Sequence, residues 1–190
     1  MYILTKIWAH LVSRVCERPM RLRTFFVLLP VLLFLTIGAV KIGGWATLQL
    51  VPREEISTRT VSTITRFETE GFVAVVRGTF MRAPLEEELK YRVAPLYALL
   101  FVWWLLFARF PGVMAFIAVG ATTSAYFGYI HGGYGNILMQ GVVGLALWWV
   151  LVVMSNYGRR PLTGYLCVVL VHALYNISIF SLKLAGTMLA

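Results

Sequence analysis

Three short clusters of polar residues interrupt apolar stretches in the C-terminal half of the chain. They are Glu87-Glu88-Leu89-Lys90-Tyr91-Arg92, Phe127-Gly128-Tyr129-Ile130-His131 and His172-Ala173-Leu174-Tyr175-Asn176. Because residues four apart share one face of a helix, Glu88 can pair with Arg92, and His172 and Asn176 form one polar stripe. Ionisable groups within membrane helices are costly and by default mark function. A carboxylate, two imidazoles and an amide together suit hydrolysis, because a glutamate can activate water and a histidine or asparagine donor can stabilise an oxyanion.

The three clusters follow the patterns EExxxR, FxxxH and HxxxN, in that order and on separate apolar helices. They resemble the motifs of the CAAX protease and bacteriocin-processing (CPBP, or Abi) family of intramembrane proteases. The resemblance covers residues 87–176, roughly the C-terminal half of the chain. The resemblance implies that Glu87 is the base that polarises the attacking water and that His131 also holds this water. It implies that His172 and Asn176 form the oxyanion hole. Glu88 and Arg92 would orient the site.

The same resemblance bears on cofactors. Glu87, His131 and His172 could ligate zinc, because carboxylates and imidazoles are common ligands of this metal. The resemblance to the structurally understood eukaryotic branch of the family favours a glutamate mechanism with no metal and no other cofactor. The residue types alone leave both mechanisms open.

Each cluster also has a purely structural explanation. The glutamates at 86–88 could open a helix, where acidic residues are favoured. His131 could be an interfacial residue beside a glycine-rich turn, and the third cluster could join neighbouring helices by hydrogen bonds. A second EExxxR pattern, at residues 54–59, has no long apolar helix directly after it and is interpreted as a solvated coincidence. The ordered occurrence of all three motifs favours one common site.

We therefore expect a multi-pass intramembrane endopeptidase that hydrolyses a peptide bond of a membrane-anchored protein or peptide near the bilayer surface. A C-terminal sorting tail or a CAAX-type tail is the kind of substrate that the resemblance implies. The alternative is a non-catalytic membrane immunity, scaffold or chaperone protein that keeps the same fold and polar core. Other intramembrane proteolytic mechanisms lack their residues, because the sequence contains no aspartate, no HExxH zinc motif and no GxSG serine motif.

The composition excludes an ordinary water-soluble globule. Of the 190 residues, 59% are apolar and 13% are charged, and the mean hydropathy is +0.79. Soluble domains have about 45–50% apolar and about 25% charged residues. The net charge of +9 is attributed to membrane topology and anionic lipid headgroups, and no nucleic-acid partner is expected. These values predict an all-α, polytopic membrane helix bundle with about five transmembrane helices.

The hydropathy pattern divides the chain into four parts. Residues 1–23 are expected to form a basic amphipathic helix on the membrane surface, and residues 24–44 a signal-anchor transmembrane helix. Residues 45–83 form a polar, interfacial connector, with a re-entrant segment as an alternative. Residues 84–190 form a four-helix catalytic membrane core, whose helices are expected at Pro84–Ala108, Pro111–Ile130, Asn136–Ser155 and Pro161–Lys183. Small residues at Gly128, Gly132, Gly141 and Gly144 should let these helices approach closely.

The distribution of basic residues predicts the orientation. The N-terminal segment carries Lys6, Arg14, Arg18, Arg21 and Arg23, so the positive-inside rule puts the N-terminus in the cytoplasm, in a plasma (inner) membrane. Five alternating spans then put Arg109 and Arg159 inside, and the uncharged 131–135 turn outside. All three motifs thereby fall in the outer half of the bilayer, which predicts cleavage on the extracytoplasmic side. A separate crossing at residues 71–81 would change this order.

Overall fold

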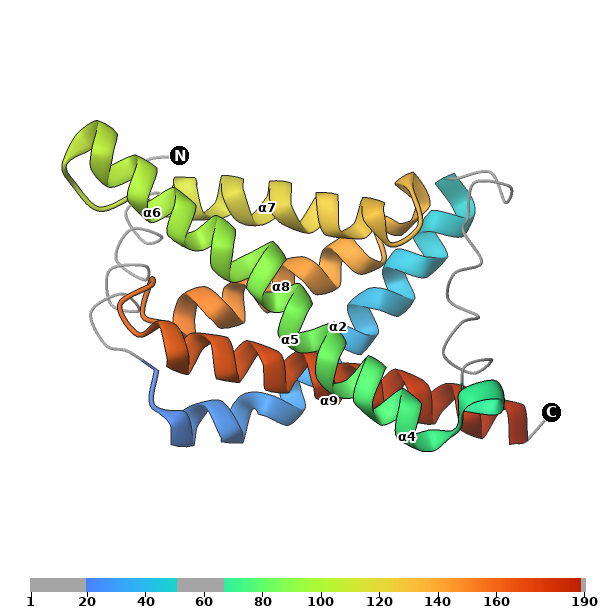
Figure 1. Ribbon diagram of the computed structural model, residues 1–190. Coiled ribbons are helices and arrows are strands. Elements are labelled where there is room, and N and C mark those ends of the chain that lie inside the picture. Colours follow the sequence, from blue (N-terminus) through green and yellow to red (C-terminus); the bar gives the residue numbers. More distant parts are fainter. Residues whose placement is uncertain (1–19, 51–66, 189–190) are drawn as a thin grey trace.

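The computed structural model describes residues 20–50 and 67–188, and the regular structure in these ranges is helical throughout. The helices run back and forth along one long axis and form a single bundle (Figure 1). The all-α helix bundle expected from the sequence is therefore confirmed. Residues 1–19 of the predicted surface helix and the second EExxxR pattern, at residues 54–59, lie outside the described residues. The predicted signal-anchor helix at residues 24–44 is longer in the structure, because residues 22–23 and 45–50 belong to the same helix.

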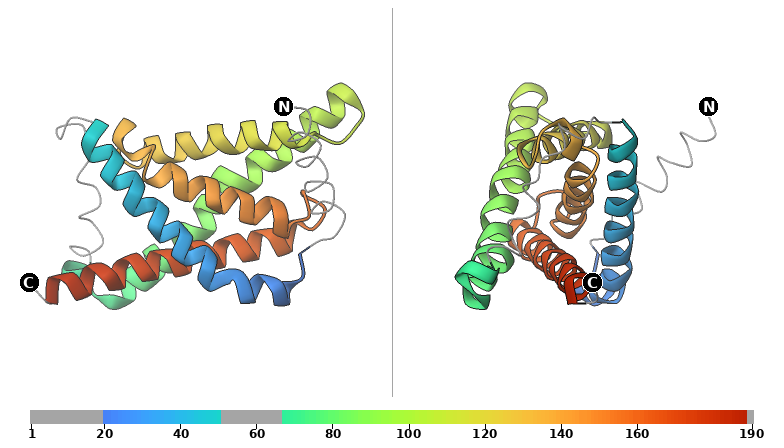
Figure 2. Two further views of the ribbon diagram at one scale, coloured as in Figure 1. Left: turned by 180° about the vertical axis from the view of Figure 1, so that it is seen from behind. Right: turned by 90° about the vertical axis from the view of Figure 1, so that its right-hand side faces the viewer.

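Four helical segments are long and apolar enough to cross a membrane. They are Leu22–Ile42 within α2 (Leu22–Leu50), Phe72–Phe107, α7 (Val113–Ile130), and Pro161–Leu182 within α9 (Pro161–Met188). The helix α8 (Gln140–Met154) is apolar but has 15 residues, which is about 22 Å and shorter than a hydrocarbon core of about 30 Å. It packs against α2, α7 and α9 and lies between them in the end-on view (Figure 2). By length and composition, the chain is a multi-pass membrane protein.

The bundle carries apolar side chains on its outside and charged side chains in its centre. Phe34 on α2 and Leu105 on the long helix are largely exposed, whereas Glu88 and Arg92 are completely buried. In water this arrangement would leave apolar surface uncovered. Against lipid it is favourable, because the apolar side chains face hydrocarbon and the charged groups face one another.

The helix that carries the first motif is continuous from Phe72 to Phe107, but two π-helical parts interrupt its α-helical winding. Its parts are α4 (Phe72–Val75), the π-helix η3 (Val76–Arg82), α5 (Ala83–Glu88), the π-helix η4 (Leu89–Val93) and α6 (Ala94–Phe107). Each π-helical part ends two residues before a proline, with one alanine between them. The N–H of Ala83, which precedes Pro84, donates to the carbonyl of Gly78 five residues earlier. The same widening before Pro95 relieves the clash of the proline ring with the preceding turn and lets the helix continue.

This helix begins earlier than the range Pro84–Ala108 expected from the sequence. Residues 72–83, expected to belong to the polar connector, are the first turns of the same helix, and residues 71–81 are not a separate crossing. Two features explain why the helix extends back to Phe72: the π-helical turns accommodate the prolines, and the added turns pack against α9. The Phe80 ring meets the ring of Phe180 on α9 with centroids 5.6 Å apart, and Val75 packs in the same cluster.

Glycines set the close packing of α7 against α8. A Cβ atom at Gly128 would lie 2.7 Å from the carbonyl oxygen of Asn136, and one at Gly141 would lie 3.2 Å from that of Ser124. A larger residue at either position would push the two helices apart. The close approach predicted for Gly128, Gly141 and Gly144 is thus confirmed.

Candidate active site

The Glu87 carboxylate faces two histidines. Its Oε1 lies 3.6 Å from His131 Nε2, and its Oε2 lies 3.7 Å from His172 Nε2. Glu87 is on α5, His131 follows the last residue of α7, and His172 is near the middle of α9, so three helices meet here (Figure 1). Each carboxylate oxygen therefore has one imidazole beside it, as expected for a group that shares a water molecule with a histidine.

The other ring nitrogen of each histidine is already bound. His131 Nδ1 lies 2.7 Å from the carbonyl oxygen of Phe127, and His172 Nδ1 lies 2.7 Å from Glu88 Oε1. Both neighbours accept hydrogen bonds, so Nδ1 carries a proton in each ring and donates it. This fixes the orientation of both imidazoles and directs both Nε2 atoms toward Glu87.

Glu88 and Arg92 form a buried ion pair behind this group. Arg92 Nε lies 3.5 Å from Glu88 Oε2, and the two side chains are 1% and 0% exposed. The Arg92 guanidinium also lies over the Phe127 ring, 3.9 Å from its centroid. The pairing predicted from the i, i+4 spacing is therefore present. Glu88 connects Arg92 to His172, an arrangement that can hold the imidazole in place.

Two residues beside Arg92 were not found by reasoning from the sequence. Ser124 Oγ on α7 is buried and has no hydrogen-bond partner among the described residues, and the same holds for Arg92 Nη1 and Nη2. A Cβ atom at Gly144 would lie 3.1 Å from Arg92 Nη2 and 3.2 Å from Ser124 Cβ. Gly144 thus makes room for the guanidinium. The glycine spacing indicated close helix packing but not its connection with the charged group.

Of the predicted site residues, Asn176 differs from the others because its side chain binds outside the group around Glu87. Its amide Nδ2 donates to the carbonyl oxygen of Thr79, 3.0 Å away in the π-helical part η3. A π-helix would pair this carbonyl with the N–H of residue 84, but residue 84 is proline and has none. Asn176 therefore satisfies a carbonyl that the helix leaves free. The structure brings Glu87, Glu88, Arg92, His131 and His172 together, and Asn176 lies one turn further along α9.

The surroundings of His131, at the edge of the site, shift the pKa of its imidazole. Burial lowers the pKa of this imidazole, whereas the Glu87 carboxylate and the Phe127 carbonyl raise it by a larger amount. The pKa of His131 therefore lies above its usual value. The protonated form is stabilised because it can donate from both nitrogens.

Glu87, His131 and His172 are also candidate zinc ligands, and zinc binding by them stays a hypothesis. Among the residues that the structure describes, no group of three or more His, Cys, Asp or Glu side chains is arranged to hold a metal ion. The mechanism proposed below uses the protein's own groups. Its metal dependence is left to a direct test.

Comparison with known proteins identified no relative, because no family model, no curated protein and no solved structure matches the chain. The assignment of a function therefore depends on the residues and geometry of the site itself.

Proposed function

We propose that this protein is an intramembrane endopeptidase of the CPBP type, a hydrolase in which Glu87 activates water. The observation that carries the proposal is the contrast between two adjacent glutamates. Glu88 is completely buried and bound to Arg92 and His172, whereas Glu87 is 26% exposed and faces two imidazoles. A general base must reach both a water molecule and the substrate, and Glu87 meets this requirement.

The proposed reaction uses each group in the place where the site holds it. A water molecule between Glu87 and His131 Nε2 gives a proton to the carboxylate, and its oxygen attacks the carbonyl carbon of the scissile peptide bond. His172 donates from Nε2 to the developing oxyanion while Glu88 stabilises the charge on the ring through Nδ1. The C–N bond then breaks and the proton on Glu87 passes to the leaving nitrogen. We keep Asn176 as a second oxyanion donor through the amide N–H that it does not give to Thr79.

The exposed face of the long helix supports cleavage near the membrane surface. Arg82 and Glu86 form an exposed ion pair at 2.6 Å, and Lys90 is also exposed. From there to Arg109 the exposed side chains are apolar. These 19 residues span about 28 Å, close to the thickness of a hydrocarbon core. Glu87, one turn before Lys90, would then lie at the level of the headgroups, where water is available.

The distribution of arginines supports an extracytoplasmic site. The described residues include five arginines at the end of the bundle where α2 and α9 begin and α6 ends, namely Arg21, Arg23, Arg109, Arg159 and Arg160 (Figure 1). The arginines toward the opposite end are Arg77 and Arg82, of which Arg82 is paired with Glu86, and Lys41, Lys90 and Lys183 also lie toward that end. On this excess of arginines, and by the positive-inside rule, we propose that the end where α2 begins faces the cytoplasm of a plasma (inner) membrane. The turn after His131 would then face outward. The substrates we propose are membrane-anchored proteins or peptides with C-terminal sorting or CAAX-type tails.

The test compares Glu87→Gln with Glu86→Gln in purified protein reconstituted into liposomes. Glu86 is the matched control, because it is adjacent in sequence but exposed and paired with Arg82. The probe is a set of synthetic transmembrane peptides with extramembrane tails, incubated in water enriched in ¹⁸O and analysed by mass spectrometry. We expect new carboxyl termini carrying ¹⁸O with wild type and Glu86→Gln. With Glu87→Gln we expect a loss of at least about 100-fold, since a general base contributes 10²–10⁴-fold.

Full activity of Glu87→Gln would overturn the mechanism. The absence of cleavage by wild type, together with unimpaired complementation by Glu87→Gln in cells, would favour the alternative, a non-catalytic immunity or scaffold protein of the same fold. Glu86→Gln should unfold at the same temperature as wild type in the same detergent, and Glu87→Gln should do so at a pH above the raised pKa of His131, where the Glu87–His131 contribution to stability is lost. This control separates loss of chemistry from loss of fold.

A further inference from the structure

A cavity lies at the end of the bundle opposite to the candidate active site. This cavity, of about 180 Å³, is formed between the loop that joins α6 to α7 and the loop that joins α8 to α9. Its lining includes Trp104, Arg109, Phe110, Pro111, Tyr157 and Arg159. A smaller cavity of about 130 Å³ shares four of these residues and extends it toward α7. Helix α7, with 18 residues, separates this end from His131 by about 27 Å.

The cavity contains two arginines, Arg109 and Arg159. In the described part of the chain, neither Arg109 nor Arg159 forms an ion pair with a carboxylate. Each guanidinium instead lies over an aromatic ring, Arg109 at 5.6 Å from the centroid of Phe107 and Arg159 at 5.5 Å from that of Phe110. These contacts orient the guanidinium groups and leave their N–H donors available to an anion.

The loops around the cavity have an unusual backbone. Within the described residues, the non-glycine positions with positive φ are Ala108, Asn156 and Tyr157, at 49°, 50° and 55°, and all three belong to these two loops. Gly158 follows with φ 88°, and its carbonyl accepts a hydrogen bond of 2.8 Å from the Tyr97 hydroxyl. Left-handed backbone at residues with a Cβ is costly and persists where surrounding contacts enforce it, often around ligands. The cavity is thus preformed.

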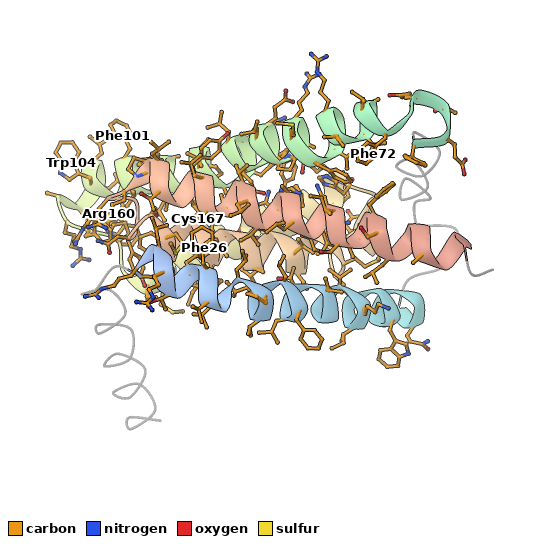
Figure 3. The ribbon with its side chains drawn as sticks, turned by 90° about the horizontal axis from the view of Figure 1, so that it is seen from below. Phe26, Phe72, Phe101, Trp104, Arg160 and Cys167 are labelled. Atoms are coloured by element: carbon orange, nitrogen blue, oxygen red, sulfur yellow. The ribbon has the colours of Figure 1, made fainter. Side chains whose placement is uncertain are left out.

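The spacing of charged residues along the chain supports a position of this cavity at the level of the lipid phosphates. Arg109 is about 28 Å along the long helix from Lys90, so these residues mark opposite edges of a hydrocarbon core. Trp104, just over one turn before Arg109, is 63% exposed. Figure 3 shows Trp104, Phe101 and Arg160 gathered at this end. Aromatic side chains next to basic ones are typical of the interface between acyl chains and headgroups.

We infer that this cavity binds the phosphate group of an anionic phospholipid. Arg109 and Arg159 receive the phosphate oxygens from two sides, and Trp104 contacts the glycerol and the upper acyl chain. A net negative headgroup is favoured over a zwitterionic one because no carboxylate of residues 20–50 or 67–188 forms an ion pair with either of the two arginines. This inference does not depend on the proposed proteolytic activity, and binding is measured without it.

The test is native mass spectrometry of the purified protein in detergent, titrated with phosphatidylglycerol or phosphatidylcholine. We expect the first phosphatidylglycerol to bind more tightly than phosphatidylcholine. Arg109→Gln or Arg159→Gln should weaken that binding about fivefold each, and the double variant about thirtyfold. The matched control is Arg160→Gln, because Arg160 is exposed in the same loop but lines neither cavity, and it should stay close to wild type.

Three results would overturn the inference. Equal affinity for the two lipids would remove the basis for an anionic site, and equal loss in Arg160→Gln would indicate diffuse attraction. Full competition by millimolar inorganic phosphate would assign the cavity to a free anion. Photoactivatable phosphatidylglycerol on wild type tests the site without any variant. Crosslinks should map to residues 108–111 and 156–160, and crosslinks confined to other segments would contradict the proposed position.

Discussion

The buried Glu88–Arg92 pair allows stability and catalysis to be separated. In Glu88→Leu the Arg92 guanidinium stays in a place where it is 1% exposed, over the Phe127 ring and without an opposite charge. In Arg92→Leu the unpaired charge is the Glu88 carboxylate. The double variant Glu88→Leu/Arg92→Leu leaves no charge behind. The three variants therefore form a double-mutant cycle around one contact.

The magnitudes follow from the burial of both groups. Removing one partner of a buried pair costs about 3–5 kcal/mol, whereas replacing both with apolar residues is often neutral or stabilising. The salt bridge is long, at 3.5 Å, and Arg92 Nη1 and Nη2 have no partner in the described part of the chain, so the pair itself contributes little net stability. We expect each single variant to lose about 3 kcal/mol and the double variant to recover most of that loss.

Activity should not recover with stability. Glu88 Oε1 holds His172 Nδ1 at 2.7 Å, and leucine cannot replace this acceptor. The free energy of unfolding is measured by titration with a denaturing detergent, and cleavage by the ¹⁸O assay. Additive losses in the double variant, or a single variant as stable as wild type, would refute the buried pair. A double variant with full activity would refute the positioning of His172.

The remaining predictions use the same two assays. Asn176→Ala should lose about 1–3 kcal/mol of stability, because the Thr79 carbonyl is left without its donor; a role confined to the oxyanion would leave stability unchanged. The raised pKa of His131 makes the Glu87–His131 contribution to stability complete below about pH 6.5, and this contribution is lost as the pH rises through the raised value. The melting temperature of Glu87→Gln should lack this pH dependence. Chelators should leave cleavage intact, and stoichiometric zinc bound in the active protein would overturn the metal-free mechanism. Tyr134→Cys should react with an impermeant thiol reagent in intact cells; labelling only after permeabilisation would put the site on the cytoplasmic side.

The parts of the site that the sequence predicted are those that depend on local periodicity. Glu88 and Arg92 are four residues apart on one helix, so their pairing follows from helical geometry alone. The positions of α7 and α9 followed from runs of apolar residues in the same way. The long helix begins at Phe72 instead of Pro84, and α8 begins at Gln140 instead of Asn136, so the same signal misplaced their starts. The convergence of Glu87 on His131 and His172 is different, because it depends on how three helices pack. Motif order suggested this convergence, but the distances required the structure.

The contact of Asn176 could not be predicted because it depends on a change in winding. The helix predicted from the sequence begins at Pro84, so Thr79 lies outside it and its carbonyl has no predicted partner. Once the helix starts at Phe72, the missing N–H of Pro84 leaves that carbonyl free. The sequence contained a signal for this in the two Ala-Pro pairs, each at the end of a π-helical part. A proline inside an apolar helix can indicate a carbonyl that needs a distant donor as well as the start of a helix.

Three consecutive glutamates show why the neighbours of a catalytic residue matter as much as its motif. Successive residues on a helix point about 100° apart, and the side chains of Glu86, Glu87 and Glu88 are 64%, 26% and 0% exposed. The first is paired at the surface and the third is sealed inside, so neither can meet a substrate and a water molecule together. The middle one lies at the boundary, beside both imidazoles. The arginine at position 92 fixes this rotation, because its buried charge requires the carboxylate four residues earlier to point inward.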